Sequence, residues 1–234
     1  MKILAVESSA TACSVALCEE ERLVAQSFQN NGLTHSRTLM PMLTQMLEHC
    51  GTALAEVDLM AVAAGPGSFT GLRIGVSAVK GLAWSLDKPC AGVSTLEAMA
   101  WTAAHMECAL CPVMDARRSQ VYNARFLGEG ERLARLTPDR AIGLDGLEAE
   151  LKRDKTPQIL IGDGAVLCYN ALRERGVEVR LAPPHLRLQS AWGVARSALE
   201  QARSGALTDA RRLAPVYHRL SQAERERLER LGQS

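Results

Sequence analysis

The chain has 234 residues, of which 47% are hydrophobic and 23% charged, and its formal net charge is +1 at pH 7. These values are typical of a globular protein with one large or two small domains, and they exclude a densely basic nucleic-acid-binding domain. No apolar run reaches the roughly 18 residues of a membrane helix, and the run after Met1 is too short for a signal peptide. We therefore expect a cytoplasmic protein that does not enter a membrane.

The cysteines and histidines give no pattern of metal ligands. Seven cysteines are scattered, mostly in apolar surroundings, which favours reduced thiols in the core. Cys108 and Cys111 form a C-x-x-C pair, but the second pair or spaced histidines of a zinc site do not follow. No two of the five histidines are three or four residues apart, so none shares a helix face with another. We predict no metal site.

The chain begins with three predicted strands and a helix. Lys2–Val6 and Cys13–Leu17 are apolar runs joined by small polar residues, which predicts a hairpin, and Leu23–Phe28 predicts a third strand. The segment from Ser36 to Cys50 has the spacing of a helix with one apolar face, and Thr34 or Ser36 is its candidate cap. The residues on that face are Leu39, Met42, Leu43, Met46, Leu47 and Cys50.

A glycine loop, Gly65-Pro66-Gly67-Ser68, follows the apolar run 59–64 and leads into a helix predicted from Thr70 to Leu86. The glycines allow a sharp turn, and Ser68 or Thr70 can cap the helix. Such a junction can hold an anion at the helix N-terminus, or it can be a close-packed turn without a ligand. Three small residues share one face of the helix and permit close approach by another backbone: Gly71, Gly75 and Ala78.

Strands and helices alternate again after a short strand at 90–93 and a helix that ends near His105. The further predicted strands are 110–114, 121–126, 158–161 and 177–181, and the further predicted helices are 144–153, 165–175 and 190–203. Two successive units of this kind predict an α/β protein with mixed sheets, divided into domains 1–106 and 107–220. The tail, 221–234, mixes Arg and Glu evenly, so we expect a solvated helix or disorder there.

Four stretches of this sequence together resemble one bacterial family. They are Ile3–Ser9 with Ala12–Leu17, His35-Ser36-Arg37-Thr38-Leu39-Met40-Pro41, the segment GPGSFTGLRIG from Gly65 to Gly75, and Asp115-Ala116-Arg117 with Val121-Tyr122. On these motifs the chain resembles the TsaB family, also called YeaZ. The resemblance covers the first half of the chain and returns at Gly162-Asp163-Gly164 and Pro215-Val216-Tyr217. It implies an actin/hexokinase-like (ASKHA) fold with two α/β domains.

The resemblance also implies a function. It implies a non-catalytic scaffold or activator subunit of the bacterial machinery that makes N6-threonylcarbamoyladenosine at position 37 of tRNA (t6A37). In that family the protein pairs with its catalytic paralogue TsaD, and the ATPase TsaE joins them. By this resemblance the chain meets tRNA only through the complex and forms a homodimer when alone. We expect no cofactor in this chain itself, and ATP or ADP only at the level of the complex.

Two loops occupy the places where ATPases of this fold hold phosphate. The residues concerned are Glu7, Ser8, Ser9 and Thr11 in the first loop and Gly162 and Gly164 in the second. Glycines and hydroxyls suit phosphate, but neither loop contains Lys or Arg, and the family often has Asp where this chain has Glu7. The loops are therefore either a vestigial nucleotide site or scaffold turns, and no catalytic residue is predicted.

The two N-terminal helices are the candidate partner surface. Part of each helix must pack on its own sheet, and we hypothesise that other faces meet the equivalent helices of TsaD. The predicted interface residues are Leu39, Met42, Leu43, Met46, Gly71, Leu72, Arg73, Gly75, Ala78 and Val79. Arg73, Arg117 and Arg118 are either contacts to partners or tRNA, or ordinary surface arginines. The alternatives are a stand-alone ATP-hydrolysing enzyme of this fold and a peptidase, for which the sequence lacks metal ligands.

Overall fold

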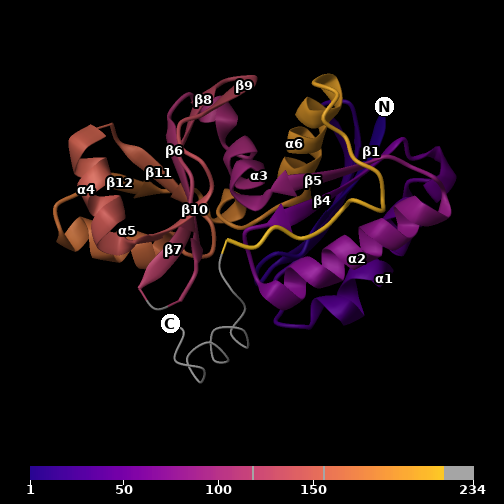
Figure 1. Ribbon diagram of the computed structural model, residues 1–234, viewed down its shortest axis with the longest axis horizontal. Coiled ribbons are helices and arrows are strands. Elements are labelled where there is room, and N and C mark those ends of the chain that lie inside the picture. The colour runs from indigo at the N-terminus through magenta and orange to yellow at the C-terminus, as the bar shows by residue number, and fades with distance from the viewer. Residues whose placement is uncertain (118, 155, 219–234) are drawn as a thin grey trace.

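The computed structural model describes residues 1–117, 119–154 and 156–218. It has two lobes, each built on a β-sheet (Figure 1). The predicted charged tail, 221–234, and Arg118 lie outside the described residues. No helix in the described ranges is both long enough and apolar enough to span a membrane.

The first sheet has the strand order β3-β2-β1-β4-β5. The predicted hairpin is confirmed, because β1 pairs antiparallel with β2 and β2 with β3. Strand β4 runs parallel to β1, and β5 runs parallel to β4. The strands are β1 (Lys2–Glu7), β2 (Cys13–Glu19), β3 (Arg22–Gln29), β4 (Leu59–Gly65) and β5 (Cys90–Ser94).

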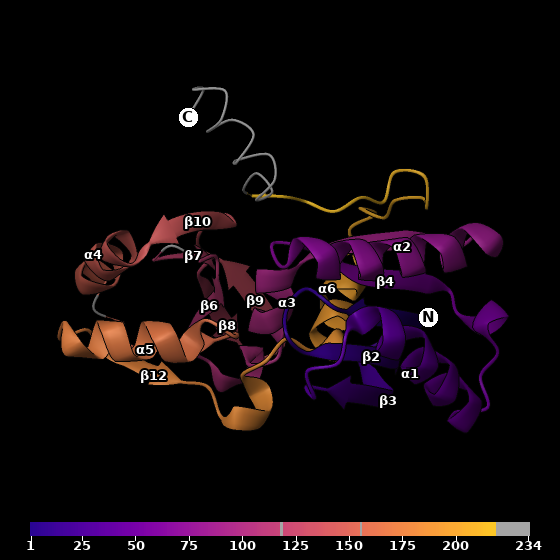
Figure 2. The same cartoon turned by 90° about the horizontal axis from the view of Figure 1, so that it is seen from below.

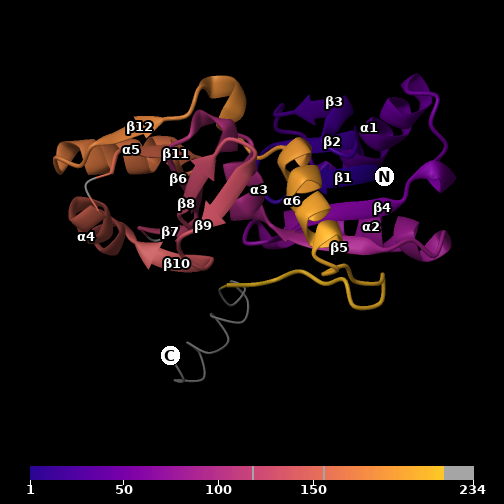
Figure 3. The same cartoon turned by 90° about the horizontal axis from the view of Figure 1, so that it is seen from above.

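Helices cover both faces of this sheet. Helices α1 (His35–His49) and α2 (Phe69–Ser85) pack on the face that carries Leu4 and Val6. Helix α6 (Ala191–Arg203), which belongs to the far end of the sequence, packs on the opposite face, against Ile3 and Ala5 (Figure 3). Burial on both faces explains why β1 is a continuous apolar run rather than an alternating one.

The second sheet has the order β10-β7-β6-β11-β12, and a β8–β9 hairpin joins it through β6. The single strand predicted at 121–126 is wrong. The segment forms two strands with different partners, since β7 pairs with β10 whereas β8 pairs with β9. Between these strands the chain leaves the sheet at Ala124, and Arg125 donates its N–H to Thr137 Oγ1. The strands are β6 (Ala109–Asp115), β7 (Gln120–Asn123), β8 (Phe126–Glu129), β9 (Arg132–Arg135), β10 (Arg140–Gly143), β11 (Gln158–Ile161) and β12 (Val179–Leu181).

Helices α4 (Leu144–Asp154) and α5 (Ala165–Glu174) cover the second sheet, and α3 (Thr95–Trp101) lies between the lobes. The helix predicted to reach His105 ends at Trp101 and is followed by a separate short turn. The described residues also include the 3₁₀ turns η1 (Leu54–Glu56), η2 (Ala104–Met106) and η3 (Pro184–Leu186).

The last described residues return to the first lobe. After α6, residues 207–217 form what we call the strap, which runs along α2 (Figure 2). Thr208 pairs with Cys90 of β5, and Val216 donates its N–H to Ala64 O at 2.7 Å. The predicted second domain, 107–220, is therefore wrong for residues 191–217, because the apolar face of α6 completes the core of the first sheet.

A polar network fastens β10 to α4 in the second lobe. Arg140 donates two hydrogen bonds to the carboxylate of Glu150, at 2.9 and 2.5 Å, and a third to Asn123 Oδ1 at 3.1 Å. The Arg140 guanidinium holds the pKa of Glu150 below its usual value. Because Glu150 is three-quarters buried, this charge-assisted pair should contribute to stability despite some solvent screening.

We expect Glu150→Gln to lower the free energy of unfolding by about 1–2 kcal/mol at pH 7. Because the pKa of Glu150 is lowered in the folded chain, its contribution is present above pH 4.5 and is lost as the pH falls through the folded pKa. Urea unfolding of wild type and Glu150→Gln at pH 7 and pH 3.5 measures the loss of unfolding free energy at each pH. An equal loss at the two pH values would contradict the ionic character of the contact.

Candidate functional site

The glycine loop packs on the β1–β2 loop of the same chain. Ser68 caps α2, as predicted, by accepting the N–H of Gly71 at 3.3 Å. Ser68 also donates its own N–H to Ser9 O at 2.6 Å, and a Cβ on Gly67 would lie 2.5 Å from that same oxygen. Of the two interpretations of this junction, the close-packed turn agrees with the structure, because these N–H groups already have partners within the chain.

The small residues at the start of α2 face Ser8 rather than solvent. Ser8 Oγ donates to Gly71 O at 2.9 Å. A Cβ on Gly71 would lie 2.1 Å from Ser8 O, and one on Gly75 would lie 2.3 Å from Ser8 Oγ. The close approach predicted for this helix face therefore exists, but it is made by the chain's own first loop. Thr70 is exposed beside it.

Glu7 is the buried acid of this site. Its Oε1 accepts the N–H of Ser9 at 2.6 Å, while its Oε2 and the Ser9 hydroxyl have no hydrogen-bond partner among the described residues. Burial raises the pKa of Glu7 to about 7, and the nearby Asp163 adds to the rise. In its charged form this carboxylate would repel a phosphate group. Thr11, also predicted here, is exposed at the tip of the loop.

The second predicted loop, 162–164, packs on the end of β6. Gly162 donates its N–H to Arg187 O at 2.7 Å, and Gly164 donates to Val113 O at 3.2 Å. A Cβ on Gly162 would lie 2.1 Å from Val113 O, so glycine is required for this contact. With these donors engaged and no basic side chain in either loop, the residues present do not fit a nucleotide polyphosphate.

Three polar residues of this region were missed by the sequence reasoning. His35 Nε2 donates to Ala10 O at 2.7 Å and so fixes the β1–β2 loop, whereas the predicted cap Thr34 makes no side-chain cap. Asp163 Oδ1 accepts from Gln189 Nε2 at 2.7 Å, and burial raises the pKa of Asp163. The sequence offered one signal for Asp163, which is its position between the predicted loop glycines Gly162 and Gly164.

The predicted interface residues of α1 and α2 are mostly buried in their own lobe. Leu39, at 1% exposure, shows how completely this face is covered. The same holds for Met42, Leu43, Met46, Gly71, Leu72, Gly75 and Val79, whereas Ala78 is half-buried and Arg73 is exposed. The prediction is therefore wrong for the buried residues, because the regular apolar spacing marks the face that packs on the sheet, and it stays a prediction for Arg73 and Ala78.

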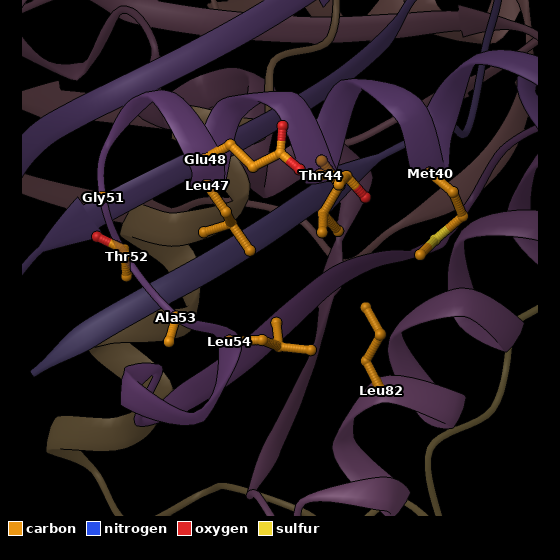
Figure 4. A pocket seen from close by; sticks show the side chains of 10 residues that line it. Met40, Thr44, Leu47, Glu48, Gly51, Thr52, Ala53, Leu54 and Leu82 are labelled. Atoms are coloured by element: carbon orange, nitrogen blue, oxygen red, sulfur yellow. The ribbon is translucent and has the colours of Figure 1, made fainter.

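Helix α1, the segment 51–54 that follows it and Leu82 of α2 line an apolar groove of about 400 Å³ (Figure 4). Met40 and Leu82 stand on the two helices on either side of it, and Leu54 of the turn η1 closes one end. Met40 is 40% exposed. An exposed methionine beside a preformed apolar groove is a feature of adaptable protein-binding surfaces.

Other candidate ligand groups are limited. Within the described ranges, no group of three or more His, Cys, Asp or Glu side chains could hold a metal ion. Arg73 is engaged with Phe69 and Tyr217, and Arg117 is exposed in the β6–β7 turn, where its N–H donates to Asp115 Oδ1 at 2.6 Å.

Comparison with known proteins identifies the family. Residues 29–162 match the family model described as TsaD, tRNA N6-adenosine threonylcarbamoyltransferase. A protein of Bacillus subtilis named tRNA threonylcarbamoyladenosine biosynthesis protein TsaB is 36% identical over 162 residues, which are 69% of this chain and 71% of that protein. The chain belongs to the TsaB family.

Solved structures agree with this family and its fold. A Pseudomonas aeruginosa protein described as similar to the peptidase YeaZ superposes with a TM-score of 0.81 at 26% identity, over 93% of this chain and 99% of that one. A ROK hexokinase from Thermus thermophilus gives a TM-score of 0.50 at 13% identity, over 86% and 98% of the two chains. The predicted actin/hexokinase-like α/β fold is confirmed.

Proposed function

We propose that this chain is a non-catalytic scaffold or activator subunit of the machinery that synthesises t6A37 in tRNA. The names of its TsaB relatives support the pathway. The observation that carries the non-catalytic role is that the chain's own glycine loop packs on the β1–β2 loop, where an ATPase of this fold would hold phosphate. The peptidase alternative has no ligand set in the part of the chain that the structure describes.

The proposed partner is TsaD, with TsaE joining the pair in the cytoplasm. The groove between α1 and α2 would receive an apolar helix of TsaD, and a second copy of this chain would cover it when TsaD is absent. Binding one conformation of TsaD better than others would activate it. Any ATP or ADP would be held at the level of the complex, and tRNA would be met there.

The test is association with TsaD from the same organism, followed by threonylcarbamoylation of tRNA. We expect Leu82→Asp to weaken the complex at least about 30-fold, because a charge would be desolvated in an apolar groove. Gln45→Asp is the matched control, since Gln45 is exposed on α1 and does not line the groove. Isothermal titration calorimetry measures both.

Two results would overturn the proposal. One is equal TsaD affinity for wild type and the Leu82→Asp variant. The other is ATP hydrolysis by this chain alone that disappears in Glu7→Gln, which would favour the stand-alone enzyme. Transfer activity that requires both chains and survives Glu7→Gln would support the scaffold role.

A further inference from the structure

A second surface lies on the other side of α2. Arg73, Ser77, Lys80 and Trp84 are spaced by four, three and four residues, so they share one face of the helix. The strap runs along this face, while α1 lies on the opposite side of α2 (Figures 1 and 2). This face is therefore separate from the groove between α1 and α2.

Side chains of α2 and the strap interlock along this face. Lys80 Nζ donates to Arg211 O at 3.0 Å and to Leu213 O at 3.2 Å. The Arg211 guanidinium lies over the ring of Trp84, 5.1 Å from its centroid. The chain thus holds a cation and a large aromatic ring together at the surface.

The N-terminal end of α2 repeats this pairing. The rings of Phe69 and Tyr217 stack with centroids 4.4 Å apart. The Arg73 guanidinium lies 3.9 Å from the centroid of Phe69, and Arg73 Nε donates to Tyr217 Oη at 3.0 Å. Arginine and aromatic groups therefore alternate along the face.

The charge of this face is positive and only partly compensated. No carboxylate in the described ranges lies within 4 Å of the charged groups of Arg73, Lys80 or Arg211, and α2 contains no acidic residue. Asp209 is the acid beside this face: its carboxylate lies 3.9 Å from Arg212, and the backbone N–H groups and positive charges of Arg212 and Arg211 hold its pKa below the usual value. The rings remain accessible, with Trp84 57% and Tyr217 40% exposed.

An excess of cations interleaved with exposed aromatic rings matches the chemistry of RNA rather than that of an acidic protein. The cations contact phosphates, and a ring offers its face to an unstacked base. A purely acidic partner would use the cations and leave Trp84 and Tyr217 without a role. We propose that this face, the α2–strap surface (Arg73, Lys80, Trp84, Arg211, Arg212 and Tyr217), contacts the backbone and an unpaired base of RNA. Only the choice of tRNA as that RNA rests on the proposed function.

The test is fluorescence anisotropy of a labelled, unmodified tRNA transcript with the full-length chain in complex with TsaD, over a series of KCl concentrations. The double variant Arg211→Ala/Arg212→Ala should bind more weakly and reduce the slope of log affinity against log salt by about 0.7 for each phosphate that is no longer neutralised. Trp84→Ala should weaken binding about ten-fold, and Trp84→Phe should restore most of it.

Matched controls lie on the second lobe. Arg180 is exposed on β12 and has no ion pair among the described residues, and Leu136 is 50% exposed. Arg180→Ala and Leu136→Ala should leave both affinity and slope unchanged. Circular dichroism and thermal unfolding check that every variant is folded.

Three results would overturn the proposal: no binding of tRNA at low salt, equal effects of Arg180→Ala and the Arg211/Arg212 double variant, or no effect of Trp84→Ala. Loss of binding to an acidic protein without loss of tRNA binding would assign the surface to that protein instead. TsaD affinity, measured on the same variants, should not change. Failure of the groove proposal is thereby distinguished from failure of this one.

Discussion

Gly71→Ala is expected to lower the free energy of unfolding by about 3 kcal/mol. The added Cβ would lie 2.1 Å from Ser8 O, which is backbone and cannot swing aside. To relieve the overlap, α2 must move away from the β1–β2 loop, which breaks the Ser8 Oγ to Gly71 O bond and weakens the Ser68 N–H to Ser9 O bond. The gain in helix propensity of about 1 kcal/mol is too small to offset this loss.

Gly81→Ala is the control for this prediction. Gly81 lies on the same helix, is exposed, and a Cβ there would meet nothing within 4 Å. This variant should be more stable than wild type by about 0.5–1 kcal/mol, since only the propensity changes. Urea unfolding followed by circular dichroism measures both. If Gly71→Ala were as stable as Gly81→Ala, the close packing of α2 on the first loop would be incorrect.

Glu7→Gln is expected to be more stable than wild type at pH 8 and to have about the same stability at pH 5. Burial raises the pKa of Glu7 from 4.5 to about 7 in the folded chain. Between these values the folded state holds a proton that the unfolded state has released, so wild-type stability falls as pH rises and levels off above the folded pKa. The loss amounts to about 3 kcal/mol, and glutamine, which cannot ionise, avoids it.

The measurement is the difference in unfolding free energy between variant and wild type from pH 4.5 to pH 8.5. Glu178→Gln is the control, because Glu178 is exposed and has no ion pair among the described residues, and its difference should stay flat. A difference between Glu7→Gln and wild type that stays the same at every pH would contradict the raised pKa of Glu7, and a destabilisation that grows as the pH rises would mean that the folded chain needs the Glu7 carboxylate in its charged form.

Sequence reasoning succeeded where a local pattern is sufficient. The β1–β2 hairpin, both N-terminal helices and the Ser68 cap follow from period, turn residues and capping chemistry, and all are confirmed. The same periodicity misled the choice of interface residues. A regular apolar stripe identifies the face of a helix that is buried, and it does not distinguish the chain's own sheet from a partner's helix.

The predictions that failed have a second physical cause, which is contact between segments far apart in the sequence. Neither the placement of α6 on the first sheet nor the pairing of Thr208 with Cys90 leaves a local signal. The packing of Gly71 on Ser8 likewise joins residues separated by most of a lobe. Glycine spacing indicated that some close approach was needed, but only the structure identifies which backbone makes it.

The position of α6 also sets an order of events during synthesis. A ribosome releases Ile3 and Ala5 long before it releases Ala191, yet α6 covers the sheet face to which Ile3 and Ala5 belong. The first lobe therefore cannot close its core as it emerges, and an apolar sheet face stays uncovered while the second lobe is translated. The nascent chain thus exposes an apolar surface of the kind that chaperones bind until α6 has left the exit tunnel.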